Sequence, residues 1–253
     1  MSGPENPPSF IVRTEAEKAA WDNGYRVPHG EREGWAEFGS TTAPGRIWIA
    51  AARVEGPWWL SFDHRSAGAE LGAEASSFGP GAYTIEIPSA AAVHAAVDRL
   101  YRLSRSLPPV PLAAFKAETA NLPQTTEAER LVVQRIGQDR FRQALLDYWS
   151  GRCPLTGITD ERLLRASHIV PWSACRDDAH RLDVHNGLLL SALWDAAFDA
   201  GLISFTDEGA SLISPQLSVA ALATLGAEAV PPLPTLTEAH CINLRWHRQH
   251  VFR

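Results

Sequence analysis

The stretch Arg165-Ala166-Ser167-His168-Ile169-Val170-Pro171-Trp172 decides the fold of this 253-residue chain. It is predicted to be a strand that ends at a proline, because proline cannot donate to a β ladder. Asn186-Gly187-Leu188-Leu189-Leu190-Ser191 is predicted to be a second strand, since Asn-Gly favours a turn and three leucines follow it. Ser191 is then a candidate N-cap for a helix that carries Asp195 and Asp199. The predicted order is strand, long loop, strand, helix, with one histidine on the first strand and two carboxylates on the helix.

This order of motifs resembles the HNH nuclease superfamily, the ββα-metal nucleases. The resemblance spans about half of the chain, from Phe141 to Arg253, and is to the branch whose strands read A-S-H-I-x-P-W and N-G-L-x-L. It includes a C-x-x-T-G at 153–157 and an L-x-x-H-R-x-x-V-F at 244–252. Several separated motifs in the right order are specific, whereas any one alone would be weak.

The resemblance implies a role for individual residues. His168 takes the position of the general base, and a neutral imidazole with a pKa of about 6.5 is the natural base near neutral pH. Asn186 takes the position of the asparagine that shapes the loop and helps to orient the base. Asp195 takes the position of the metal ligand on the helix, where the family usually has histidine or asparagine. Ser167 stands where the family often has an acidic or histidine ligand.

The implied cofactor is one divalent cation, Mg²⁺ or Mn²⁺, which would hold the phosphate and stabilise the leaving oxygen. Asp199 lies four residues after Asp195 on the same helical face and could contribute directly or through water. A structural hydrogen bond at the helix end is the alternative for Asp199. We expect the imidazole of His168 and the carboxylate of Asp195 to converge on the cation across the two-strand hairpin.

The net charge of −6 is the main argument against a DNA partner, because polyanion binders usually carry a basic footprint. A bound cation would neutralise part of the site, and nearly all of the positive charge is arginine, the better phosphate ligand. Arg165, Arg181 and Arg248 are the candidate contacts to double-stranded DNA. Packing is the alternative for Arg248.

The three cysteines, Cys153, Cys175 and Cys241, are far apart and odd in number. This favours a reducing compartment, hence the cytoplasm, and argues against a disulfide framework. No structural zinc is expected, because the sequence has no C-x-x-C pair. No apolar run approaches the roughly 20 residues that span a membrane, and no signal peptide is apparent.

The fold class is predicted to be α+β, with an N-terminal α+β domain (1–107), a helical linker (108–124) and a C-terminal ββα-metal nuclease domain (125–253). The proline-rich Leu107–Leu112 marks the boundary. Within the first domain, strands are predicted at 46–54, 57–62 and 83–87 and a helix at 90–103, whereas 25–43 are expected to be mostly loop.

The N-terminal domain would sense or position DNA, and the resemblance implies restriction-type endonucleases, some of which act on modified DNA. Trp58, Trp59 and Tyr83 are either sheet packing or an aromatic pocket for a flipped or modified base. The rival hypothesis is a catalytically inactive DNA-binding or regulatory protein on the same scaffold. A toxin-like nuclease is a third hypothesis, and a homodimer stays open.

Overall fold

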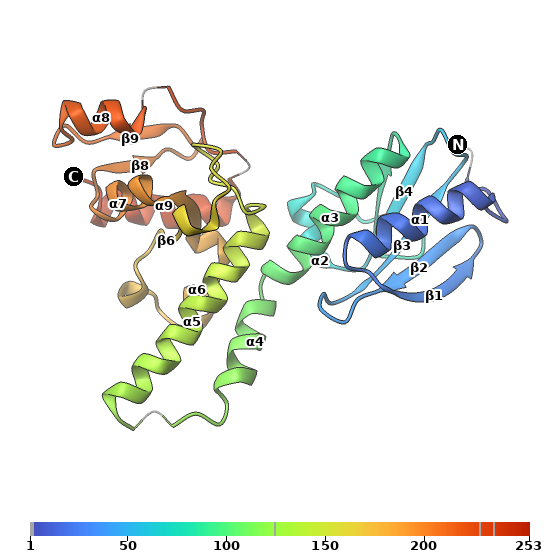
Figure 1. The fold of residues 1–253 in the computed structure, drawn as a ribbon, viewed down its shortest axis with the longest axis horizontal. Helices are drawn as coiled ribbons and strands as arrows, with labels where there is room; N and C mark the ends of the chain where they lie inside the picture. Colours follow the sequence, from blue (N-terminus) through green and yellow to red (C-terminus); the bar gives the residue numbers. More distant parts are fainter. Residues whose placement is uncertain (1–2, 124, 228, 235) are drawn as a thin grey trace. The chain divides into compact units, whose positions relative to one another are not determined.

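The chain divides into two compact units in the computed structural model, residues 1–105 and 106–253 (Figure 1). The structure describes residues 3–123, 125–227, 229–234 and 236–253. Within these ranges no helix is both long and apolar enough to cross a membrane. Helices and strands are mixed throughout, so the predicted α+β class is confirmed.

The first unit is built on a five-stranded antiparallel sheet in the order β1-β2-β3-β4-β5. Helix α1 lies against β2 and β3 (Figure 1). The face of the sheet that carries Ile47, Ile49 and Leu60 is fully buried and forms the core of the unit. The elements are α1 (Phe10–Asp22), β1 (Val27–Arg32), β2 (Trp35–Gly39), β3 (Arg46–Ala51), β4 (Trp58–Phe62), α2 (Arg65–Glu70), β5 (Tyr83–Ile87) and α3 (Ala90–Ser106).

The expectation of a loop over 25–43 is wrong, because β1 and β2 form a hairpin there. The turn between them is Glu33-Gly34, and both residues have positive φ, as a tight two-residue hairpin requires. Five of the six residues of β1 are exposed, so this edge strand carries no alternation of apolar and polar residues. The charged sequence of β1 is therefore typical of a loop. It forms a strand because of its hydrogen bonds to β2.

In the second unit, a short hairpin of β6 and β7 contacts helices α5 and α7. Helix α4 packs on α5, so most of 108–124 is one arm of a helical pair. A capping box between Thr126 and Glu129 begins α5. The elements are α4 (Val110–Thr119), α5 (Glu127–Tyr148), β6 (Leu164–His168), α6 (Asp178–Arg181), β7 (Gly187–Ser191), α7 (Ala192–Asp199), β8 (Ile203–Phe205), β9 (Ser211–Ile213), α8 (Val219–Leu225) and α9 (Glu238–His250), with 3-10 turns at Glu161–Leu163, Trp172–Ala174 and Val184–Asn186.

The β6–β7 hairpin pairs His168 with Gly187 and Ser167 with Leu188. Strand β6 ends at His168, earlier than predicted, because the side chain of Asn186 replaces the ladder beyond it. The N–H of Ile169 still donates to the Asn186 carbonyl at 3.0 Å, whereas the N–H of Val170 donates to Asn186 Oδ1 at 2.8 Å. The chain therefore leaves the strand conformation after His168, before Pro171.

Helices α5 and α7 cover opposite faces of this hairpin. A Cβ on Gly187 would lie 2.4 Å from the ring of Phe141 in α5, so glycine is required where β7 crosses this helix. On the other face, the Ser167 hydroxyl donates to Asp195 of α7. Neighbouring residues of a strand point to opposite faces, which gives each helix its own set of side chains from β6.

Candidate active site

His168 is held as a neutral imidazole at the end of β6. Its ring stacks on Phe141 at 3.8 Å between centroids and meets the edge of Trp172 at 5.6 Å. Its Nε2 lies 2.9 Å from the carbonyl oxygen of Arg181, which can only accept, so Nε2 carries the proton and Nδ1 keeps a lone pair. Burial lowers the pKa of His168 to about 4, so the ring is uncharged at neutral pH.

Asn186 is fully buried and fixes the loop that follows the histidine. Besides accepting from the Val170 N–H, its Nδ2 donates to the carbonyls of Val170 at 3.2 Å and His180 at 3.3 Å. The His180 carbonyl immediately precedes the Arg181 peptide that binds the imidazole. The geometry thus agrees with the loop-shaping role that the resemblance implies for Asn186.

Ser167 and Asp195 form a pair on the α7 face of the hairpin, where the serine hydroxyl donates to the Asp195 carboxylate. His168 follows Ser167 in β6, and its cross-strand partner Gly187 faces α5. That the side chains of His168 and Asp195 converge on one cation stays a prediction. Alternation along β6 sends the side chains of Ser167 and His168 to opposite faces of the hairpin.

Asp199 is the carboxylate that shares an open cavity with His168. The cavity has a volume of about 320 Å³, and Ala166, Pro171 and Trp172 also line it. Burial and then the negative charge of Asp195 raise the pKa of Asp199 to about 6. The two carboxylates of α7 are therefore close enough to repel one another, as their i, i+4 spacing indicates.

His247 has a structural role that the sequence left undefined. Its Nε2 donates to the Phe198 carbonyl at 3.2 Å, and its Nδ1 accepts from the Ser204 hydroxyl at 3.0 Å. The ring also stacks on Phe198 at 4.0 Å, with an angle of 2° between the ring planes. His247 lines the same cavity as His168 and ties the end of α7 to α9 and β8. Its place in the L-x-x-H-R motif was the only signal in the sequence.

The three candidate DNA contacts lie in different environments. Arg181 donates to Asp178 at 2.8 Å, and its guanidinium lies 5.3 Å from the ring centre of Trp172. Arg165 is exposed on β6 and donates to backbone carbonyls of its own segment. Arg248 donates to the Phe205 carbonyl and to Asp207, each at 2.7 Å. The internal partners of Arg248 favour packing, while a DNA contact by Arg165 or Arg181 stays a prediction.

The candidate metal ligands form a set of oxygen donors. In the described part of the chain, no group of three or more His, Cys, Asp or Glu side chains is arranged to hold a metal ion. Ser167, Asp195 and Asp199 nevertheless offer one hydroxyl and two carboxylates, which are hard ligands of the kind that Mg²⁺ and Mn²⁺ accept together with water. The mutual repulsion of the two carboxylates is what a cation would relieve. These residues fit a hydrated divalent cation.

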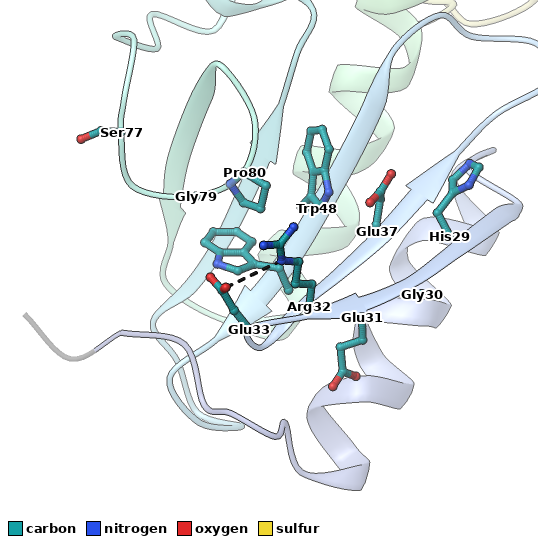
Figure 2. Close-up of a pocket in the computed structure, with 11 residues that line it drawn as sticks. His29, Gly30, Glu31, Arg32, Glu33, Glu37, Trp48, Ser77, Gly79 and Pro80 are labelled. Atoms are coloured by element: carbon teal, nitrogen blue, oxygen red, sulfur yellow. Dashed lines mark ion pairs between the residues drawn. The ribbon is translucent and has the colours of Figure 1, made fainter.

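A second cavity, of about 700 Å³, opens on the sheet of the N-terminal unit (Figure 2). Figure 2 shows Trp48 and Glu37 projecting from neighbouring strands, with Arg32 and Glu33 at the end of β1 and Pro80 on a facing loop. Burial raises the pKa of Glu37, but hydrogen bonds from Arg46 and Trp48 lower it by more, so the pKa lies below its usual value. The carboxylate is therefore ionised and oriented.

The predicted aromatic trio does not form this cavity. Trp58 is fully buried on the core face of β4, and Tyr83 stacks on Phe62 at 5.6 Å. Trp59 points to the opposite face, where it joins the cluster of Trp35 and Ala50. The aromatic side chains that line the cavity are Trp35 and Trp48, because the alternation along β2 and β3 brings them to the open face.

The site is built on two strands and a helix. A histidine ends the first strand, a buried asparagine precedes the second, and the helix carries carboxylates. This arrangement defines a ββα nuclease-like site. Residues 153–206 match the model of the family described as HNH endonuclease. This segment runs from the C-x-x-T-G motif through β8 and contains every candidate catalytic and metal-binding residue. No curated protein matches the chain.

Proposed function

We propose that this protein is a metal-dependent endonuclease that hydrolyses phosphodiester bonds in double-stranded DNA. The observation that carries the proposal is the neutral His168, fixed in one tautomer beside a cavity that contains Asp199, within the segment similar to HNH endonucleases. An imidazole that keeps its Nδ1 lone pair beside an open cavity is suited to accept a proton from water.

In the proposed reaction, His168 Nδ1 takes a proton from a water molecule, and that water attacks the phosphorus. The Arg181 carbonyl accepts from Nε2–H, so it orients the ring and stabilises the imidazolium as it forms. The negative phosphodiester favours the same charged form. Asn186 forms hydrogen bonds to Val170 and to the His180 carbonyl, so it holds the loop that contains the Arg181 carbonyl. It therefore acts as a positioning residue.

Ser167, Asp195 and Asp199 would hold the Mg²⁺ or Mn²⁺ ion. When bound, this cation supplies positive charge to the phosphorane and to the leaving 3′-oxygen. The protein's own contribution there is to keep two carboxylates on one face of α7, with Ser167 oriented by Asp195.

The test is cleavage of duplex DNA with Mg²⁺ or Mn²⁺ by the wild type and by His168→Ala. The wild type should cut, whereas His168→Ala should bind DNA with similar affinity and lose cleavage by about 10²–10⁴-fold, as expected for a general base. His250→Ala, which removes an exposed histidine of α9, is the matched control and should cut normally. Binding without cleavage by the wild type would instead support the inactive DNA-binding alternative, which the serine at position 167 favours.

We further propose that the enzyme is of the restriction type and acts on modified DNA, which the N-terminal unit would recognise. The support is the cavity of Figure 2, where Trp48 could stack on an extruded base and Glu37 could accept from an exocyclic amino group. Unmodified and cytosine-modified duplexes should be cut at different rates, and Trp48→Ala should remove the difference. Trp21→Ala is the control, because Trp21 is exposed on α1. Equal cutting of both duplexes by the wild type would exclude this specificity.

A further inference from the structure

A groove beside the candidate active site lies between α4, α5 and the segment that follows His168. Its volume is about 530 Å³. Trp172 lines both this groove and the cavity that contains His168 and Asp199. The groove and the cavity of the candidate base therefore share the Trp172 side chain as a wall.

The groove is basic, although the chain as a whole has a net charge of −6. Lys116 of α4, Arg130 of α5 and Arg181 line it. The one acidic residue among its lining side chains is Asp178, which forms an ion pair with Arg181 at 2.8 Å. Lys116 is exposed and has no ion pair with any residue that the structure describes. Lys116 therefore contributes positive charge to the groove that no described carboxylate neutralises.

The wall of the groove contacts the imidazole through Trp172. Trp172 meets His168 edge to face, and its carbonyl accepts from Arg181 Nε at 3.2 Å. Gly137 lies inside α5, where glycine is unfavourable, and a Cβ there would lie 2.6 Å from the Trp172 ring. The missing side chain lets the indole pack against the helix. An ion pair between Arg140 and Glu118 joins α5 to α4.

We propose that this groove binds the phosphate backbone of DNA beside the scissile bond, with Lys116 and Arg130 each contacting a phosphate. The inference rests on the proposed nuclease function and adds a substrate-binding surface outside the ββα segment. A run of phosphates is the partner that suits it, because the groove offers cations along two helices and shares Trp172 with the cavity of the residue that would activate water.

The first test measures DNA binding to a short labelled duplex over a range of salt concentrations, without divalent metal so that no strand is cut. The variant is Lys116→Gln with Arg130→Gln. The control is Arg135→Gln with Arg152→Gln, which removes the same two charges from exposed positions outside the groove. The double variant should bind at least about tenfold more weakly at physiological salt, and its slope of log affinity against log salt should be smaller by roughly 1.8, or about 0.9 for each lost phosphate contact.

The second test uses the wild-type protein, so a folding defect cannot affect it. Lys18 and Lys116 are the only lysines in the sequence. Saturation with DNA should protect Lys116 from an amine-reactive reagent, as measured by mass spectrometry, and leave Lys18 as reactive as before. DNA binding with an unprotected Lys116, or an unchanged salt slope in the double variant, would overturn this inference and leave the nuclease proposal intact. A wild type that binds no DNA would overturn both.

Discussion

At the scale of single residues, the site depends on buried polar groups that each have defined partners. Asn186 satisfies both the N–H and the carbonyl of Val170, and the Arg181 carbonyl selects the tautomer of His168. These groups are costly to bury unless they are hydrogen-bonded. The identity of each residue is therefore fixed by its hydrogen bonds as well as by its chemistry.

Asn186→Ala should destabilise the second unit by about 2–4 kcal/mol, because it leaves buried backbone groups of Val170 without partners. DNA cleavage should fall as well, since the loop after His168 loses its anchor. Urea unfolding measures the first effect. Asn121→Ala, at an exposed position, is the control and should change neither quantity. Wild-type stability in Asn186→Ala would show that the loop is held by other contacts.

The stability of the protein should decrease in mild acid because of His247. Burial is the main cause that lowers the pKa of His247 from 6.5 to about 4 in the folded state. The unfolded state therefore binds a proton at a higher pH than the folded state does. Stability from this residue is complete above pH 6.5 and is lost as the pH falls toward 4, by about 3 kcal/mol in total. Urea unfolding at several pH values should show a shallower decline in His247→Gln. His250→Gln, at an exposed position of α9, should decline like the wild type.

At the scale of elements, the hairpin works because α5 and α7 cover its two faces. The imidazole of His168 stacks on Phe141 of α5, whereas the hydroxyl of Ser167 donates to Asp195 of α7. The cavity at its end is where His168 and Asp199 share a solvent-accessible space. The spacing of the two aspartates on α7 lets one of them bond Ser167 while the other reaches that cavity.

Gly187→Ala should therefore destabilise the protein strongly, although it adds only one methyl group. The added Cβ would lie 2.4 Å from the Phe141 ring, so α5 and the hairpin must separate. We expect a loss of about 1–3 kcal/mol, as for other overpacked cores, together with weaker cleavage because His168 stacks on the same ring. Gly3→Ala, where a Cβ meets nothing within 4 Å, is the control. A thermal unfolding curve equal to that of the wild type would contradict this account of the packing.

At the scale of the whole molecule, metal binding should be linked to stability. Two repelling carboxylates on α7 are relieved by a cation, so Mg²⁺ or Mn²⁺ should raise the unfolding free energy of the wild type, by about 2.7 kcal/mol at a metal concentration 100 times Kd. Asp195→Asn with Asp199→Asn should abolish this effect. Asp139→Asn, an exposed change on α5, should retain it. Calorimetric titration checks the same point, and equal metal binding by all three proteins would exclude these ligands.

The order and type of most elements could be predicted from the sequence. The strand bearing His168, the strand 187–191, the helix over 192–199 and the strand over 83–87 all carry strong local signals, and the structure contains each of them. The β1–β2 hairpin could not be predicted in this way, because β1 is an exposed edge strand whose charged residues show no periodicity. Its conformation depends on hydrogen bonds to a strand that the local sequence does not reveal.

The sequence by itself determined which chemical groups the site contains: one imidazole, one asparagine and two carboxylates in a fixed order. Only the tertiary structure decided which of them meet, placing Ser167 with Asp195 and His168 with Asp199. It also added Trp172 and the basic groove of Lys116 and Arg130, which come from helices distant in the chain. The physical reason is that periodicity along a strand or a helix gives each side chain a face, whereas packing between elements decides what that face contacts.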